Sequence, residues 1–512
     1  MLVKSYAAAV QGISATIITI EVNCTKGIQF FLVGLPDVAV RESHERIISA
    51  LEVSGYKFPR NRIVINMAPA DIRKEGSAYD LPLAIGILAA AGELDASRLD
   101  RFMMMGELSL DGSLQPVKGV LPIAIKAREE GFKGFIVPRQ NAREAAVVND
   151  LEVYGATSIK EVIEFMAGKS RMEPTVVNTR EEFYTRQLQF ESDFSDVRGQ
   201  ENVKRAMEVA AAGGHNLILI GPPGSGKSML AKRLPSILPP FTLQESLETT
   251  KIHSVAGKIG INMALMTQRP FRSPHHTISN VAMVGGGTFP QPGEISLAHN
   301  GILFLDELPE FNRNVLEVMR QPLEDGKITV SRARFSVDYP ANFMLVASMN
   351  PCPCGYYNHP DRPCLCPPGA VRKYMNRVSG PLLDRIDIQI EVVPVPFEKI
   401  SEQQPSEPSA VVRERVMKAR AVQEERFSTH PGIYSNAQMT SKMLHEYAVP
   451  DTAGLELLKK AMLRLNLSAR AYDRILKVSR TIADLEASPK IEVCHLAEAI
   501  NYRNLDRETW GT

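Results

Sequence analysis

The sequence predicts an α/β protein with more than one domain, and three observations support this prediction. The 512 residues exceed the size of one ordinary domain. Strand-length apolar segments alternate with helix-length segments through residues 1–168, which is typical of sheets covered by helices. A G-x-x-x-x-G-K-S segment at 221–228 follows another apolar run, as in a strand–loop–helix unit that holds phosphate.

The first 168 residues form the first predicted α/β domain. Ile47, Ile48 and Leu51 recur on one face of the predicted helix 38–54. The predicted strands are 28–33, 62–66, 102–106 and 134–138, and the predicted helices are 38–54, 81–91, 121–130 and 159–167. The stretch 169–192 is polar and charged without a clear period, so we predict a linker there.

Residues 193–396 carry the candidate chemistry and form the second predicted domain. A stretch rich in Pro, Ser and Glu, 397–410, is the second predicted linker. Residues 411–512 are predicted to be helical, with Pro450 and Pro489 as breakers. The predicted helices are 441–447, 453–465, 469–486 and 493–504.

Composition excludes several classes of protein. Lys plus Arg total 59 and Asp plus Glu total 58, which argues against a globally basic nucleic-acid coat but permits a local basic stripe. The longest uncharged apolar run, 81–92, is too short to span a bilayer, and no export signal is apparent. Six cysteines are too few for a disulfide framework. We therefore expect a cytoplasmic protein without a membrane partner.

The phosphate-binding motif is the strongest local signal. The apolar run 216–220 predicts a buried parallel strand before it, and 229–238 predicts the helix after it. We expect loop amides to cradle phosphate, Lys227 to reach the β- and γ-phosphates, and Ser228 to ligate Mg²⁺. The motif consists of Gly221, Pro222, Pro223, Gly224, Ser225, Gly226, Lys227 and Ser228. A plain Gly-Pro surface turn is the alternative.

Polar residues follow two further apolar runs. Asp306 and Glu307 end the run 302–305, and Asn350 ends the run 343–349. We expect Asp306 to join Ser228 in the Mg²⁺ shell, Glu307 to polarise the attacking water, and Asn350 to position it. Acidic or amide strand ends are common on any surface, but the phosphate motif upstream favours the catalytic interpretation.

Three longer segments resemble the magnesium-chelatase-like AAA+ ATPases. They are RPFRSPHHTISNVAMVGGG at 269–287, PGEISLAHNGILFLDELPEF at 292–311 and SGPLLDRIDI at 379–388. The similarity to the YifB/ComM subgroup covers essentially the whole chain. The resemblance implies an AAA+ αβα P-loop core with a C-terminal helical lid, a homo-hexameric ring, and ATP bound between subunits.

The same resemblance implies roles for two arginines. Arg385, in Leu-Leu-Asp-Arg-Ile-Asp, matches the arginine finger that reaches the neighbour's γ-phosphate. Arg470 matches the sensor-2 arginine, with Ser468 as a candidate N-cap, and 197–200 matches the segment that packs on adenine. Ordinary salt-bridged arginines are the alternative.

Four cysteines form a C-x-C-x9-C-x-C pattern directly after Asn350. They are Cys352, Cys354, Cys364 and Cys366, with His359 between the pairs. Four thiolates suit a closed structural zinc site, although the C-x-C spacing is tighter than usual and His359 could replace one sulfur. A zinc site, a metal-free loop and a redox dithiol all remain open.

Residues 62–140 resemble the Lon-type protease domain, which implies a ribosomal-protein-like α/β fold for the first domain. The matching segments are KEGSAYDLP at 74–82 and GELSLDG at 106–112. Lon chemistry needs a serine nucleophile and a lysine base, and these positions fall on Ala78 and Leu121. Ser77 and Lys118 leave a shifted dyad as the alternative. We expect a scaffold or interaction domain without peptidase activity.

Four functions are compatible with these motifs: a DNA-remodelling motor, a chelatase-like subunit, an ATP-dependent protease and a nucleotide-gated scaffold. The missing dyad disfavours the protease, and the Asp306–Glu307 pair disfavours a scaffold that only binds nucleotide. A chelatase would need a partner subunit to hold the porphyrin. We expect a helicase or branch-migration ATPase in recombination or natural transformation, with chelatase-like metal insertion or remodelling of a protein partner as the alternative.

A candidate DNA-binding element supports the motor. Residues 326–338 alternate like a hairpin, with Arg332 and Arg334 near its turn. The segment resembles the pore hairpin of replicative MCM helicases, and Arg332 falls at the position of their DNA-contacting lysine. We expect sequence-independent binding of single-stranded or branched DNA, with ATP and Mg²⁺ as cofactors. An exposed hairpin with solvated arginines is the alternative.

Overall fold

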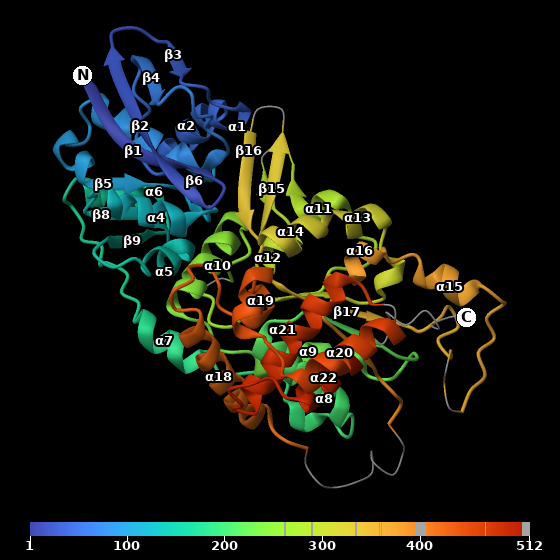
Figure 1. Ribbon diagram of the computed structural model, residues 1–512. Coiled ribbons are helices and arrows are strands. Elements are labelled where there is room, and N and C mark those ends of the chain that lie inside the picture. Colours follow the sequence, from blue (N-terminus) through green and yellow to red (C-terminus); the bar gives the residue numbers. More distant parts are fainter. Residues whose placement is uncertain are drawn as a thin grey trace.

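The computed structural model describes residues 1–260, 263–287, 290–332, 335–357, 359, 361–395, 406–465 and 467–503. The molecule is a mixed α/β protein with a helical C-terminal region. In Figure 1 the N-terminal unit, in blue and cyan, lies beside the central unit, and the C-terminal helices, in orange and red, pack on the central unit.

A seven-stranded mixed sheet forms the N-terminal unit, in the order β3-β4-β2-β1-β5-β8-β9. Its strands are β1 (Leu2–Gln11), β2 (Ser14–Thr25), β3 (Phe30–Val33), β4 (Arg62–Ala68), β5 (Phe102–Met104), β8 (Gly134–Pro138) and β9 (Glu152–Ala156). The sequence analysis did not predict β1, β2 or β9. The successive alanines Ala7, Ala8 and Ala9 have little intrinsic strand preference, but all three are buried in the core of this unit.

Helices cover this sheet. They are α1 (Val38–Arg41), α2 (Ser43–Val53), α3 (Asp80–Ala90), α4 (Val120–Glu129), α5 (Ala142–Ala145) and α6 (Ile159–Met166). The single helix predicted at 38–54 is two helices that meet at Glu42. Every residue of α3 is buried, which explains why its sequence lacks a polar face. The short strands β6 (Glu107–Leu108) and β7 (Leu114–Gln115) form a separate hairpin.

A five-stranded parallel sheet forms the core of the central unit, with its strands in the order β11-β14-β17-β10-β18. Its strands are β10 (Leu217–Ile220), β11 (Phe271–Arg272), β14 (Ile302–Leu305), β17 (Met344–Met349) and β18 (Ile388–Glu391). Leu217 and Leu219 face one hydrophobic core, while Ile218 and Ile220 face another. Because both faces are covered, the strands read as continuous apolar runs.

Nine helices and two short strands surround this sheet among the described residues. The helices are α8 (Glu201–Gly213), α9 (Lys227–Arg233), α10 (Leu243–Ala256), α11 (Asn280–Val284), α12 (Glu294–Leu297), α13 (Arg313–Val318), α14 (Arg320–Asp325), α15 (Ala370–Met375) and α16 (Gly380–Leu383). The strands β12 (Gly285–Gly286) and β13 (Gln291–Pro292) pair with each other.

The hairpin predicted at 326–338 is present as β15 (Lys327–Arg332) and β16 (Phe335–Pro340). In Figure 1 it rises from the central unit beside the N-terminal unit. Gly12, in the turn between β1 and β2, packs on Val337: a Cβ added to Gly12 would lie 2.8 Å from Val337 Cγ1. Arg332 is the last residue of β15, and Arg334 lies outside the described residues.

The C-terminal region is helical, as predicted. It contains α18 (Ser409–Arg426), α19 (Ser441–Tyr447), α20 (Thr452–Arg464), α21 (Ala469–Leu485) and α22 (Val493–Asn501). Helices α18 and α21 pack on α8. The stretch 169–192, predicted as a linker, contains helix α7 (Thr179–Arg186). Of the second predicted linker, residues 406–410 are described. No helix among the described residues has the length and apolar content needed to cross a membrane.

Candidate functional site

The phosphate-binding motif connects β10 to α9, as the sequence predicts. Gly226 precedes the first residue of α9 with φ of 90°, a left-handed conformation that glycine adopts without strain. The loop therefore turns directly into the helix, whose amino-terminal amides point toward a bound anion. Ser225 Oγ is buried and has no hydrogen-bond partner among the described residues, so the loop retains a donor suited to a phosphate oxygen.

Lys227 lies at the centre of this site. Its ammonium donates to the carbonyl oxygens of Gly221 at 2.8 Å and Pro222 at 2.9 Å, and to Asn350 Oδ1 at 3.2 Å. Burial lowers the pKa of Lys227, while the charges of Asp306 and Glu307 oppose that shift. A buried cation held mainly by neutral carbonyls is well placed to bind a polyphosphate.

Ser228 and Asp306 meet as the sequence analysis expected. Ser228 Oγ donates to Asp306 Oδ2 at 2.6 Å. Ser348, on β17, donates its hydroxyl to Asp306 Oδ1, so both carboxylate oxygens are oriented. A hydroxyl beside a carboxylate is the oxygen pair that holds Mg²⁺ in P-loop NTPases, and these residues fit that ion.

Glu307, the residue after Asp306, is exposed. Its backbone is left-handed, with φ of 56°, and its amide donates to Asp306 Oδ1 at 3.2 Å. His276 Nδ1 lies 3.8 Å from Glu307 Oε2. A solvent-facing carboxylate beside the phosphate loop is free to accept a proton from water.

Arg385 and Arg470 lie together at the amino ends of the parallel strands, opposite the carboxyl ends that carry the phosphate loop. Arg385 precedes β18, which runs parallel to β10, and its carbonyl accepts from Asn216 at the amino end of β10. Its guanidinium is buried and donates to Pro381 O at 2.5 Å and to Glu324. Arg470 lies 3.6 Å from Asp384, the residue before Arg385. Arg385 thus lies beside the amino end of β10, whereas the phosphate loop follows the carboxyl end of that strand.

Ser468 caps α21 as expected, and it accepts a hydrogen bond from Ala471 N at 3.2 Å. The segment expected to pack on adenine, 197–200, leads into α8. Val197 is buried, and the Gln200 side chain donates to Val393 O.

The sequence analysis missed several residues that contact the predicted ones. They are Ser348, His276, Glu324 and Asp384. Ser348 carried a signal, because it is a polar residue inside an otherwise apolar run. The other three have no local signal, since their partners are 31, 61 and 86 residues away in the chain.

The four cysteines converge. The sulfurs of Cys352, Cys354, Cys364 and Cys366 all lie within 4.8 Å of one another. Burial raises the pKa of the Cys354 thiol, but hydrogen bonds from the amides of Tyr356 and Leu365, together with those to Cys352 and Cys366, outweigh burial and lower that pKa to about 6. His359 does not join the cluster, because its Nδ1 accepts hydrogen bonds from the amides of Asp361 and Arg362 at 3.0 and 3.1 Å.

The two positions of the Lon-type dyad do not form a catalytic site. Leu121 is fully buried, and its amide donates to Glu144 at 3.1 Å and to Ser254, on α10, at 3.4 Å. Helix α10 therefore covers the position where a lysine base would stand. Ser77 opens a short 3₁₀ turn, and Lys118 is exposed beside Gly257.

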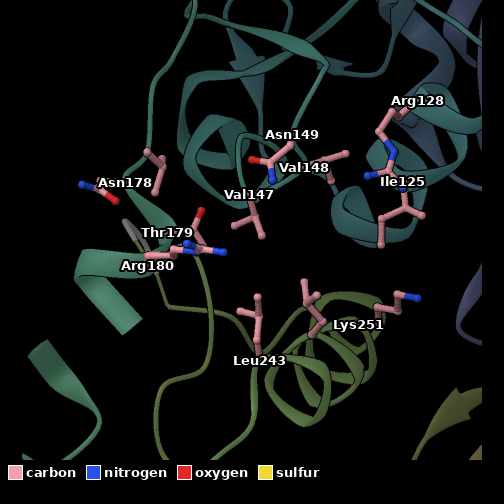
Figure 2. A pocket seen from close by; sticks show the side chains of 12 residues that line it. Ile125, Arg128, Val147, Val148, Asn149, Asn178, Thr179, Arg180, Leu243 and Lys251 are labelled. Carbon is pink, nitrogen blue, oxygen red and sulfur yellow. The ribbon is translucent and has the colours of Figure 1, made fainter. Parts of the chain in front are cut away.

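A separate cavity of about 600 Å³ lies between the two units. Figure 2 shows Arg128 and Lys251 on one side of it, Arg180 on the other, and Val147 between them. Its lining comes from α4, the segments 147–149 and 177–180, and α10. None of residues 221–228 lines it, so it is distinct from the phosphate-binding site.

Comparison with known proteins supports the motif-based resemblance. Sequence models of the magnesium chelatase subunit ChlI match residues 193–400 and 20–141, and its C-terminal model matches residues 406–503. Competence protein ComM of Haemophilus influenzae is 45% identical over 504 residues, covering 98% of this chain and 97% of that protein. The protein YifB of Escherichia coli is 45% identical over 506 residues, covering 98% and 96%.

A partial similarity extends to a protease. Lon protease 2 of Bacillus subtilis is 29% identical over 157 residues, which cover 28% of this chain and 27% of that protein. The full-length similarities and the three chelatase models agree with the segments that resemble this family in sequence. The chain belongs to the YifB/ComM family of magnesium-chelatase-like AAA+ ATPases.

Proposed function

We propose that this protein is an ATP-hydrolysing ring motor that acts on DNA as a helicase or branch-migration enzyme. One observation carries the ATPase part. Lys227, Ser228, Asp306, Glu307 and Asn350 come from three neighbouring parallel strands and gather at the carboxyl edge of one sheet. Ligands of open α/β sheets bind at this edge.

Each residue has a separate task in this proposal. Lys227 exchanges its loop carbonyls for phosphate oxygens, and Ser228 with Asp306 holds Mg²⁺. The ion neutralises charge on the β- and γ-phosphates when bound. Glu307 orients the attacking water and accepts its proton, and Asn350 fixes both Lys227 and the water.

The positions of the two arginines support a ring in this proposal. Arg385 and Arg470 lie at the sheet edge opposite the phosphate loop, so they contribute to a neighbour's site rather than to their own. A head-to-tail ring would bring the two edges of adjacent subunits together. Arg385 would then exchange its pair with Glu324 for the neighbour's γ-phosphate.

The DNA part rests on the β15–β16 hairpin and on a relative's name. Arg332 ends β15 next to the turn, and one such residue per subunit would give a ring of positive charge. The relative from Haemophilus influenzae is named a competence protein, and competence concerns DNA uptake. We place the activity in recombination or natural transformation.

Three further features belong to the same proposal. The N-terminal unit, residues 1–168, serves as a Lon-like scaffold without peptidase activity, and 193–396 and 411–512 form the ATPase core and its lid. The cysteine cluster holds a structural Zn²⁺. The chelatase models favour one alternative, a chelatase-like ATPase that drives metal insertion or remodels a protein partner.

A salt series with DNA separates the motor from this alternative. We expect DNA to stimulate ATP hydrolysis. We also expect the affinity for DNA to fall as salt rises: the logarithm of the binding constant should drop by about 0.7 per phosphate contact on a single strand for each tenfold rise in salt concentration. Arg332→Ala should flatten that slope and abolish stimulation while keeping basal hydrolysis. Lys327→Ala, at the base of the same strand and paired with Asp338, is the matched control. Absence of DNA binding by the unmodified protein would refute the motor.

A further inference from the structure

The segment between β17 and α15, residues 350–369, has no helix or strand among its described residues. We call it the cysteine loop. Its one large aliphatic side chain, Leu365, is 82% exposed, so the loop has no apolar core of its own. A structureless segment of this length inside a compact domain needs a cross-link to hold one conformation.

The sulfurs have the spacing of a tetrahedral zinc site. Four thiolates at about 2.3 Å from zinc lie about 3.8 Å from one another in a regular tetrahedron. The Sγ atoms of Cys352 and Cys364 are 3.8 Å apart, those of Cys354 and Cys364 are 3.6 Å apart, and those of Cys352 and Cys354 are 3.3 Å apart. These three separations lie near the tetrahedral value, and Cys366 completes a cluster whose sulfurs all lie within 4.8 Å of one another.

Backbone amides also point at two of the sulfurs. Amide groups of Tyr356 and Leu365 donate to Cys354, and that of Tyr357 donates to Cys352. Such hydrogen bonds orient metal-bound sulfurs and offset their negative charge.

Three contacts join this loop and the end of β17 to the phosphate loop. Gly221 N donates to Met349 O at 3.2 Å, and Lys227 donates to Asn350 Oδ1 at 3.2 Å. Gly355 packs against Pro223, because a Cβ at Gly355 would lie only 2.4 Å from Pro223 Cδ. Cys352 is fully buried two residues after Asn350, so one ligand of the cluster is continuous with a residue of the ATP site.

We propose that the zinc-bound cysteine loop is a brace for the phosphate loop, and that loss of the zinc switches off ATP binding and hydrolysis. This inference rests on the proposed zinc and ATP sites and adds a regulatory link between them. The four thiolates hold the backbone at Gly355 and Asn350 in place. Gly355 in turn packs against Pro223, and Asn350 accepts the hydrogen bond from Lys227. Without the cluster the loop loses the cross-link between its two cysteine pairs, and the phosphate loop loses support on this side.

The test compares zinc content with nucleotide binding. The reduced full-length protein should contain one zinc per chain by elemental mass spectrometry. Cys364→Ser/Cys366→Ser should lose that zinc, bind a fluorescent ATP analogue more weakly, and hydrolyse ATP about 10²-fold more slowly, the cost of misplacing catalytic groups by about 1 Å. Cys494→Ser, an exposed cysteine outside the cluster, is the matched control.

A second variant separates the brace from a general folding defect. Pro223→Ala keeps all four thiolates and the backbone of the cysteine loop but removes the ring against which Gly355 packs. It should retain zinc and its circular dichroism spectrum, yet lose nucleotide affinity. Zinc-free wild-type protein, or a disulfide within the cluster of the active protein, would overturn the inference. Normal ATP binding in the zinc-free double variant would also overturn it, while leaving both proposed sites intact.

Discussion

The assignment of Arg385 to a neighbour's site makes a sharp prediction about mixed rings. Gly221 follows β10 at one edge of the sheet, and Arg385 precedes the parallel strand β18 at the other. A four-residue strand spans roughly 13 Å, so Arg385 cannot reach its own chain's phosphates. Arg385→Ala should reduce ATP hydrolysis by about 10³–10⁵-fold, as loss of an arginine finger does. Lys227→Ala should abolish nucleotide binding.

Mixing the two inactive variants should restore activity. In a head-to-tail ring each interface pairs one subunit's phosphate loop with its neighbour's arginine. In an equimolar mixture about a quarter of the interfaces combine an intact Lys227 with an intact Arg385. We therefore expect about a quarter of the wild-type rate, against background for either variant alone.

The assay is steady-state ATP hydrolysis after subunit exchange, with ring size checked by mass photometry. The control mixes Arg385→Ala with the double variant Lys227→Ala/Arg385→Ala, which offers no intact interface and should stay inactive. If verified mixed rings stay as inactive as this control, Arg385 does not act in a neighbour's site.

Three other predictions follow from single residues. Glu307→Gln should keep nucleotide binding but slow hydrolysis by about 10²–10⁴-fold, because the proton acceptor is lost; normal turnover would exclude Glu307 as the base. The protein with ATP should not cleave unfolded casein, because helix α10 covers Leu121; cleavage that Ser77→Ala abolishes would contradict this. Asp387→Asn should destabilise the protein by about 3 kcal/mol at neutral pH, since it leaves the partners of a buried carboxylate unpaired. Burial raises the pKa of Asp387, but Arg474 and His215 outweigh it and hold that pKa well below its usual range. The stabilisation is therefore complete above about pH 4 and lost as pH falls further. Thermal unfolding of the unmodified protein and of Asp387→Asn at several pH values measures the difference in their stability. If that difference in strong acid is the same as at neutral pH, the prediction is wrong.

The sequence by itself determined the parts of this protein whose chemistry is local. The strands β8, β14 and β10 are continuous apolar runs, because both faces of a parallel sheet are buried. The phosphate motif connects β10 to α9 because its glycines permit the turn. The hairpin and the helices α19 to α22 follow from alternation and from helix breakers, and they lie within a few residues of their predicted positions. The long helix α18 was not predicted as a separate helix, and its first two residues lie in the predicted linker 397–410.

Tertiary structure decided what depends on distant partners. Strands β1 and β2 are stabilised by pairing and by burial of alanines, which local preference does not reveal. Only the order of the strands brings Ser228, Asp306 and Ser348 together and places Arg385 at the opposite edge. The cysteines were visible as a pattern, but their contact with the phosphate loop was not, because it depends on Gly355 meeting Pro223 across 132 residues of chain. Local propensity acts over a few residues, whereas a site is assembled by packing between elements far apart in the sequence.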